Sequence, residues 1–156
     1  MDFRVAIITG VCRSGKTLLG QLLGSMRNVE HIDEPWLPMV LPVMQGKKLI
    51  NPEVARTLLQ SFTEELFNDM ILLRNANFRP KDLSSIWERK SAWEIFSRLV
   101  NLQSRDDVKR YVRDNNSVLL YNLAEVMPYL DFLIKVFPHC KIIHVVRNGL
   151  DVALSI

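Results

Sequence analysis

The segment 10–17 has the composition of an anion-binding loop. It reads Gly-Val-Cys-Arg-Ser-Gly-Lys-Thr and fits the spacing G-x-x-x-x-G-K-[ST], between an apolar run and a leucine-rich run. Between a strand and a helix, such a loop turns its backbone N–H groups and the positive end of the helix dipole toward one concavity. Arg13 and Lys16 add two positive charges. The segment therefore predicts a site for a phosphate or sulfate group.

A second pair of anion-binding side chains lies near the other end of the chain. Arg147 directly follows the apolar run 141–146, and Ser155 lies within the next predicted helix. Ligands of open α/β sheets sit beyond the carboxyl ends of the strands, so both side chains are expected to reach a second anionic group there. Asp151, near the start of that helix, is interpreted as structural because the helix dipole favours an acid at this end.

Short apolar runs alternate with stretches of helical spacing, and this alternation predicts the fold. Strands are expected at 3–9, 30–32, 117–121 and 141–146, and helices at 17–25, 52–70, 86–100, 105–113 and 127–137. The proline-rich segment 35–52 is expected to be a loop. The prediction is an α/β fold with a P-loop-type parallel sheet flanked by helices. A helical insertion, residues 53–114, separates the two anion-binding motifs.

Composition describes a single globular domain spanning residues 1–156. Hydrophobic residues make up 48% and charged residues 24% of the chain, which excludes a disordered or disulfide-built protein. The net charge of +3 suits a small anionic ligand and falls short of what nucleic-acid binding requires. The sequence contains no run of about 18 apolar residues, so no membrane span is predicted. Residues 150–156 open a helix that has no cap, so the chain is expected to be truncated at its C-terminus.

The two cysteines indicate a reducing environment. Cys12 and Cys140 are far apart in the sequence and lack the spacing of metal ligands, so a cytoplasmic protein without a bound metal is expected. Cys12 lies inside the anion-binding loop but has no evident histidine partner, and it is interpreted as a small packing residue.

The two motifs together resemble those of sulfotransferases that use 3′-phosphoadenosine 5′-phosphosulfate (PAPS). The segment 13–17 matches the pattern R/K-S-G-x-T, which binds the 5′-phosphosulfate in that family. The segment 147–155 matches R-[ND]-x-x-D-V-x-x-S, which binds the 3′-phosphate. The segments 18–20 and 31–36, with Glu34 before a proline, look like further motifs of Golgi-type carbohydrate sulfotransferases and their bacterial relatives. The resemblance covers residues 3–36 and 128–156.

This resemblance implies PAPS as the cofactor and assigns roles to particular residues. Arg13, supported by Lys16, would stabilise the charge that grows on the leaving oxygen, and no metal ion would be needed. Arg147 and Ser155 would hold the 3′-phosphate. The 5′-phosphate would be held by Arg13, Ser14, Gly15, Lys16 and Thr17.

The acceptor implied by the resemblance is a hydroxyl group of a small molecule or carbohydrate, which requires a general base. Glu34 is the candidate because it stands at the family's Glu-Pro position, with Asp33 as the alternative and His31 as the third choice. Trp36, beside the candidate base, is a residue that can either stack on a sugar ring or pack in the protein.

Two other functions stay open at this point. Lys16 stands where the family usually has threonine or serine, and this lysine is typical of a P-loop kinase that uses ATP. Such kinases usually hold magnesium with an aspartate at a strand end, whereas the expected strands end before Asn122 and Arg147, and only Asp33 could serve. The Asp-Lys pair that often ends the family's preceding strand is also missing from 119–122. A non-catalytic nucleotide-binding domain is the third hypothesis, and the sequence leaves the oligomeric state open.

Overall fold

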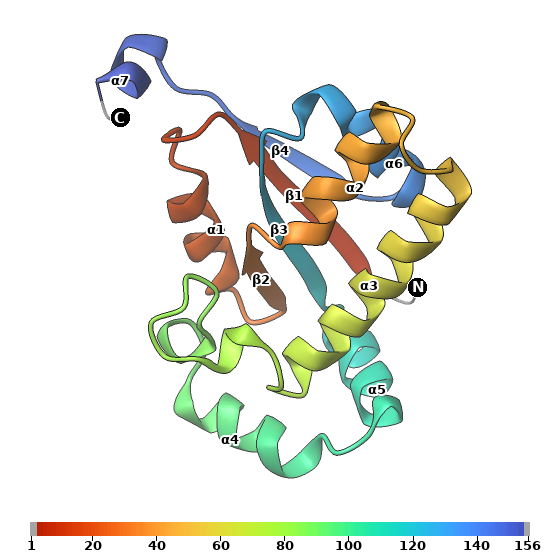
Figure 1. The fold of residues 1–156 in the computed structure, drawn as a ribbon. Helices are drawn as coiled ribbons and strands as arrows, with labels where there is room; N and C mark the ends of the chain where they lie inside the picture. Colours follow the sequence, from red (N-terminus) through yellow and green to blue (C-terminus); the bar gives the residue numbers. More distant parts are fainter. Residues whose placement is uncertain (1–2, 155–156) are drawn as a thin grey trace.

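A four-stranded, all-parallel sheet forms the centre of the molecule, in the order β2-β3-β1-β4. The computed structural model describes residues 3–154. The strands are β1 (Arg4–Gly10), β2 (Val29–Asp33), β3 (Val118–Ala124) and β4 (Lys141–Val145). Since helices flank this parallel sheet, the predicted α/β fold class is confirmed (Figure 1).

The helices divide between the two faces of the sheet and its lower end (Figure 1). One face is covered by α1 (Lys16–Gly24) and the other by α2 (Trp36–Gly46), α3 (Pro52–Ile71) and α6 (Leu130–Val136). Near the amino ends of the strands lie α4 (Ala92–Asn101) and α5 (Arg105–Asn115), and α7 (Gly149–Ala153) follows β4. Short 3₁₀ helices span Ala76–Phe78, Ile86–Glu88 and Met127–Tyr129.

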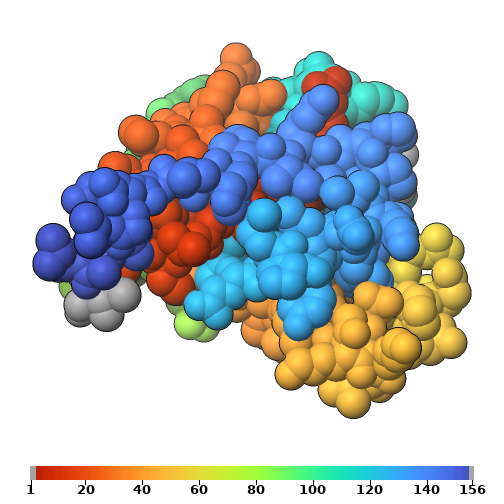
Figure 2. All heavy atoms as spheres, turned by 90° about the horizontal axis from the view of Figure 1, so that it is seen from above, coloured from red at the N-terminus to blue at the C-terminus, as the bar shows by residue number. Residues whose placement is uncertain are grey.

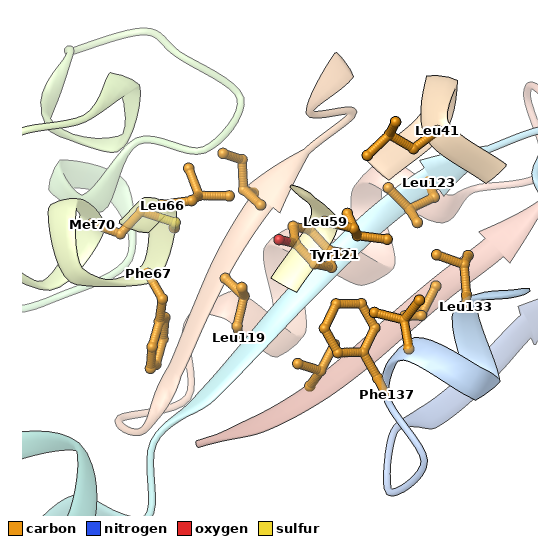
Figure 3. Close-up of a cluster of buried hydrophobic side chains, with 14 of the residues drawn as sticks. Leu41, Leu59, Leu66, Phe67, Met70, Leu119, Tyr121, Leu123, Leu133 and Phe137 are labelled. Atoms are coloured by element: carbon orange, nitrogen blue, oxygen red, sulfur yellow. The ribbon is translucent and has the colours of Figure 1, made fainter. Parts of the chain in front are cut away.

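The larger hydrophobic core lies between the sheet and α3 (Figure 3). Leu59 and Phe67 of α3 pack there with Tyr121 of β3, and all three are at most 1% exposed. Burying a side chain of this size contributes about 1.5–3 kcal/mol. The core on the α1 face is smaller and contains Leu19 and Leu23. The pattern of leucines in α1 therefore predicted the packing face only in part, because Leu18 and Leu22 are exposed.

The prediction of a loop over 35–52 is wrong for most of its length, because α2 occupies Trp36–Gly46. Pro35 precedes the helix and Pro38 lies in its first turn, where a missing N–H removes no hydrogen bond. Pro42 lies in the interior of the helix, beyond the first turn, and it is buried together with Pro38 and Leu41. Burial of this apolar face against the core compensates the hydrogen bond that Pro42 cannot form.

Two other predicted boundaries need correction. The helix expected over 86–100 is interrupted after a 3₁₀ turn and starts again at α4, where the Ser91 hydroxyl accepts the N–H of Glu94. The strand expected to end at Tyr121 continues to Ala124. The predicted start of α3 is confirmed, since the Asn51 side chain accepts two backbone N–H groups.

The sheet order places the functional loops at a single edge. All four strands run in the same direction, so the segments that follow them meet at their carboxyl ends. Gly10, the last residue of β1, is in register with Ala124 of β3 and Val145 of β4. The loop 10–17 therefore begins between the ends of two neighbouring strands.

Candidate functional site

The loop 10–17 has a backbone conformation that depends on its glycines. Gly10, Arg13 and Gly15 have positive φ angles of 155°, 63° and 101°. At Gly10, a Cβ atom would lie 2.6 Å from the carbonyl oxygen of Val145, so a side chain there would separate β1 from β4. Gly15 forms the N-cap of α1 in the left-handed region, which glycine adopts without strain. These two positions explain why the motif requires glycine at its spacing.

The amino end of α1 carries hydrogen-bond donors that no capping side chain satisfies. The helix has no side-chain cap and no acid in its first turn, and its first hydrogen bond runs from the N–H of Leu19 to Gly15 at 3.0 Å. The N–H groups of residues 16–18 therefore lack an acceptor within the helix. The Ser14 side chain is buried, and its Oγ also has no hydrogen-bond partner. Together with the helix dipole, these donors suit a phosphate group.

The two cations of the loop are held differently. Lys16 is 5% exposed, and its Nζ donates to the carbonyl oxygen of Val11 at 3.2 Å, so the side chain lies back across the loop. An ammonium group has three protons, so this hydrogen bond does not use the full donor capacity of Lys16. Arg13 is exposed on the same loop. The structure thus brings Arg13, Ser14, Gly15, Lys16 and Thr17 together at the start of α1.

The second motif meets the first through Arg147. Its Nη1 donates to the carbonyl oxygen of Arg13 at 3.2 Å, across a large separation in sequence. Viewed from above, the C-terminal segment lies beside the N-terminal loop (Figure 2). Asn148 caps α7 by accepting the N–H of Leu150 at 2.9 Å, and Asp151 lies in the first turn of that helix. Ser155 lies outside the described residues.

Glu34 follows β2 at the same edge of the sheet. Its side chain is exposed, its φ is 44°, and its N–H donates to the carbonyl oxygen of Asn122 at 2.9 Å. This hydrogen bond ties the turn after β2 to β3, the strand that lies between β2 and β1. Trp36, the first residue of α2, is 64% exposed and therefore does not serve as a core residue.

The comparison with known proteins agrees with this geometry. A family model described as "Sulfotransferase family" matches residues 6–156, which include both motifs and the helices between them. The chain belongs to the sulfotransferase family. No curated protein and no solved structure matches it.

Two of the three base candidates in this sulfotransferase are engaged in contacts that hold the fold. The Asp33 carboxylate accepts a hydrogen bond from the Asn122 amide, and its N–H donates to the Ser84 hydroxyl at 2.9 Å. His31 is 2% exposed, and its Nδ1 lies 2.7 Å from Nη1 of Arg89. His31 is therefore not accessible to an acceptor, and its place as third candidate base is wrong.

His31 is expected to make folding stability depend on pH. Burial, with the positive charge of Arg89 beside the ring, lowers the pKa of His31 from 6.5 to about 3. Between these values the unfolded chain binds more protons, so stability falls as the pH drops below 6.5. We expect a loss of about 1 kcal/mol between about pH 7 and about pH 5.5, measured by urea unfolding. His31→Gln should lose correspondingly less over this range, and an identical loss in both proteins would contradict this origin.

Glu125 lies beside the loop 10–17 and is a candidate site residue that the sequence did not indicate. It directly follows β3, has a φ of 57°, and its Oε1 lies 3.6 Å from Sγ of Cys12 on the anion-binding loop. Cys12 is exposed, so its interpretation as a packing residue is wrong. A carboxylate therefore follows β3, because this strand extends beyond Asn122, although the aspartate and the Asp-Lys pair are absent as the sequence indicated. The apolar residues at 123 and 124 were the signal for this longer strand.

The described part of the chain offers neither a metal cluster nor a membrane span. Within residues 3–154, no three His, Cys, Asp or Glu side chains are grouped so that they could hold a metal ion. No helix in the same range is long and apolar enough to cross a membrane. Cys12 and Cys140 are both free. Free thiols are typical of reducing compartments, and a cytoplasmic location stays a prediction.

Proposed function

We propose that this sulfotransferase moves a sulfuryl group from PAPS to a hydroxyl group of a small molecule, with carbohydrates as the first acceptor class to test. The observation that carries this proposal is the hydrogen bond between Arg147 and the carbonyl of Arg13. It joins the segment that resembles a 3′-phosphate site to the loop that resembles a 5′-phosphosulfate site. A nucleotide with anionic groups at both its 3′ and its 5′ position would contact both segments.

The loop fits the 5′-end of this cofactor. The buried hydroxyl of Ser14 has no hydrogen-bond partner, and the N–H groups at the start of α1 have no side-chain cap. An anionic group could accept hydrogen bonds from these donors. We assign the 5′-phosphate to these donors and to the backbone of Gly15, with Lys16 and Thr17 in support. Arg147, joined by Ser155, would hold the 3′-phosphate, for which a guanidinium offers two parallel hydrogen bonds.

Charge stabilisation is the main chemical task of the loop in this proposal. When bound, PAPS supplies a sulfuryl group on an oxygen that leaves with the 5′-phosphate. Arg13 and Lys16 would place positive charge beside that oxygen, where negative charge grows in the transition state. A sulfuryl group carries less negative charge than a phosphoryl group, so two protein cations can fulfil this task without a metal ion.

Glu34 is our proposal for the general base. Its exposed carboxylate stands at the carboxyl edge of the sheet, the edge at which the loop 10–17 also lies. As the acceptor oxygen forms its bond to sulfur and the old S–O bond breaks, the proton of the hydroxyl would pass to Glu34. The neighbouring, exposed ring of Trp36 offers a surface on which a sugar can stack.

Glu34→Gln is expected to lower turnover by about 10²–10⁴-fold, the usual contribution of a general base, and to leave cofactor affinity nearly unchanged. Glu53→Gln is the matched control, because Glu53 is an exposed glutamate in the first turn of α3. Glu125→Gln tests the second carboxylate near the loop. Unchanged turnover in Glu34→Gln, with a large loss in Glu125→Gln, would transfer the role of base to Glu125.

A transfer assay tests the function itself. The protein is incubated with sulfur-labelled PAPS and a panel of hydroxyl acceptors, and separately with γ-labelled Mg-ATP. Label from PAPS should appear in an acceptor without added magnesium. Lys16 and the carboxylate of Glu125 beside the loop are the two features that favour a kinase. Transfer from Mg-ATP alone would establish that alternative.

A further inference from the structure

The turn that carries Glu34 has a strained backbone. Glu34 directly follows β2 and has a φ of 44°, in the left-handed region that residues with a side chain rarely adopt. Such a conformation persists only where the surrounding structure fixes it. Pro35 comes next and forms the N-cap of α2. The contacts that hold residues 33 and 34 therefore also determine where the Glu34 carboxylate lies.

Asn122 holds this turn from the side of β3. It is 0% exposed and lies in register with Asp33 of the neighbouring strand β2. Its backbone carbonyl accepts the N–H of Glu34 at 2.9 Å, and its side-chain amide donates to the Asp33 carboxylate. One buried residue therefore binds two consecutive residues of the turn, the first through its side chain and the second through its backbone.

Ser84 holds the same turn from the loop that precedes the 3₁₀ helix Ile86–Glu88. Its hydroxyl accepts the N–H of Asp33 at 2.9 Å, and the Ser84 side chain is buried. The N–H of Ser84 in turn donates to the Asp82 carboxylate at 2.7 Å, which fixes the loop locally. Because β2 is the outermost strand in the order β2-β3-β1-β4, this loop supports the end of the strand together with β3. The helical insertion 53–114 thus contributes a contact to the turn before the candidate base.

We propose that Asn122 is a positioning residue for sulfuryl transfer. Its side-chain hydrogen bond to Asp33, supported by Ser84, keeps the Glu34 carboxylate where the acceptor hydroxyl binds. This inference rests on the proposed function, because Asn122 is buried and acts only through Glu34. A displacement of about 1 Å in a reacting group can cost about 10²-fold in rate, so the hold on the turn has a direct kinetic consequence.

Asn122→Ala removes the side-chain hydrogen bond and keeps the backbone carbonyl. In the folded variant, kcat should fall by about 10–10²-fold, whereas the acceptor KM and the affinity for 3′-phosphoadenosine 5′-phosphate should stay nearly unchanged. Combined with Glu34→Gln, it should cause almost no further loss, because both changes affect the same proton transfer. Asp33→Ala removes the same hydrogen bond from its less buried partner and replaces Asn122→Ala if the latter does not fold. Asp33→Asn keeps the acceptor oxygen and should recover most of the turnover that Asp33→Ala loses.

Thr63→Val is the matched control for a merely structural effect. Thr63 is buried, and its Oγ1 accepts the hydroxyl of Tyr121, the residue before Asn122 on β3, at 2.9 Å. This variant therefore also removes a buried hydrogen bond of β3, but it leaves the turn after β2 untouched. It should lower the urea concentration at the midpoint of unfolding and leave the kcat of the folded protein unchanged.

Amide hydrogen exchange reports on the turn without an activity assay. The Glu34 N–H should exchange about tenfold or more faster in Asn122→Ala than in the wild type, because the turn opens more easily without the bond to Asp33. The N–H groups in the middle of β3 serve as the internal reference. Thr63→Val should leave the rate of Glu34 unchanged relative to that reference.

Four results would overturn the inference. They are full turnover in folded Asn122→Ala, a loss that adds fully to that of Glu34→Gln, an equal loss in Thr63→Val, and an unchanged exchange rate of the Glu34 N–H. Failure of the proposed function would be distinct, because the wild-type chain would then transfer no label from PAPS. The kinetic role of Asn122 would be refuted with it, and the exchange rates would still decide whether Asn122 holds the turn.

Discussion

Arg13→Ala is expected to reduce the turnover of PAPS by about 10²–10³-fold, the usual cost of removing one group that stabilises charge in a transition state. The cofactor dissociation constant should change much less. The backbone and hydroxyl donors of the loop stay in place, and Lys16 still lies across it. Rapid-quench kinetics with saturating labelled PAPS measures the loss in the chemical step.

Two further variants make this result specific. Arg13→Lys keeps the positive charge and should recover part of the lost turnover, whereas a structural role of the side chain would give no such recovery. Arg27→Ala is the matched control, since Arg27 is an exposed arginine that follows the opposite end of α1. Full turnover in Arg13→Ala would remove this residue from the proposed mechanism.

Arg147→Ala is expected to weaken the binding of 3′-phosphoadenosine 5′-phosphate by about 10–100-fold, as the loss of hydrogen bonds from a charged group would. The binding of adenosine 5′-phosphosulfate, which lacks the 3′-phosphate, should stay nearly unchanged. Comparing the change in affinity for each ligand isolates the 3′-phosphate, because both ligands contain adenosine with a 5′-phosphate and only the first has a 3′-phosphate. Isothermal titration calorimetry with the two ligands measures it.

The control for Arg147 must address its contact with the loop. Since Arg147 also donates to the carbonyl of Arg13, its removal could disturb the 5′-site. Equal losses for both ligands would indicate such a disturbance and would refute the assigned role. Lys141→Ala removes an exposed cation from the start of β4 and should leave both affinities as they are.

The position of the loop 10–17 between β1 and α1 could be predicted from the sequence because most of its conformation is determined locally. Gly10 and Gly15 are required by φ angles and by one close backbone approach, and the strand and helix on either side follow from nearby apolar residues. The same holds for the start of α3, where Asn51 and Pro52 form a local cap. The spacing of residues in a short segment encodes these features directly.

The features that the sequence analysis missed depend on tertiary contacts. Burial of α2 outweighs the hydrogen bond lost at Pro42. His31 is hidden because α1 packs closely over it: a Cβ atom at Gly20 would lie 2.3 Å from its Nε2. Glu125 reaches the loop only because β3 pairs with β1 along its full length. None of these contacts follows from local spacing.

Calorimetry of nucleotide binding tests the central claim most directly. Titrating the full chain with 3′-phosphoadenosine 5′-phosphate, with and without magnesium, should show tight binding of equal affinity in both cases. A parallel titration with Mg-ATP should show much weaker binding, because ATP offers no phosphate at the 3′ position to Arg147. Binding of Mg-ATP alone, or binding of the 3′-phosphorylated nucleotide only in the presence of magnesium, would contradict the proposed sulfotransferase site.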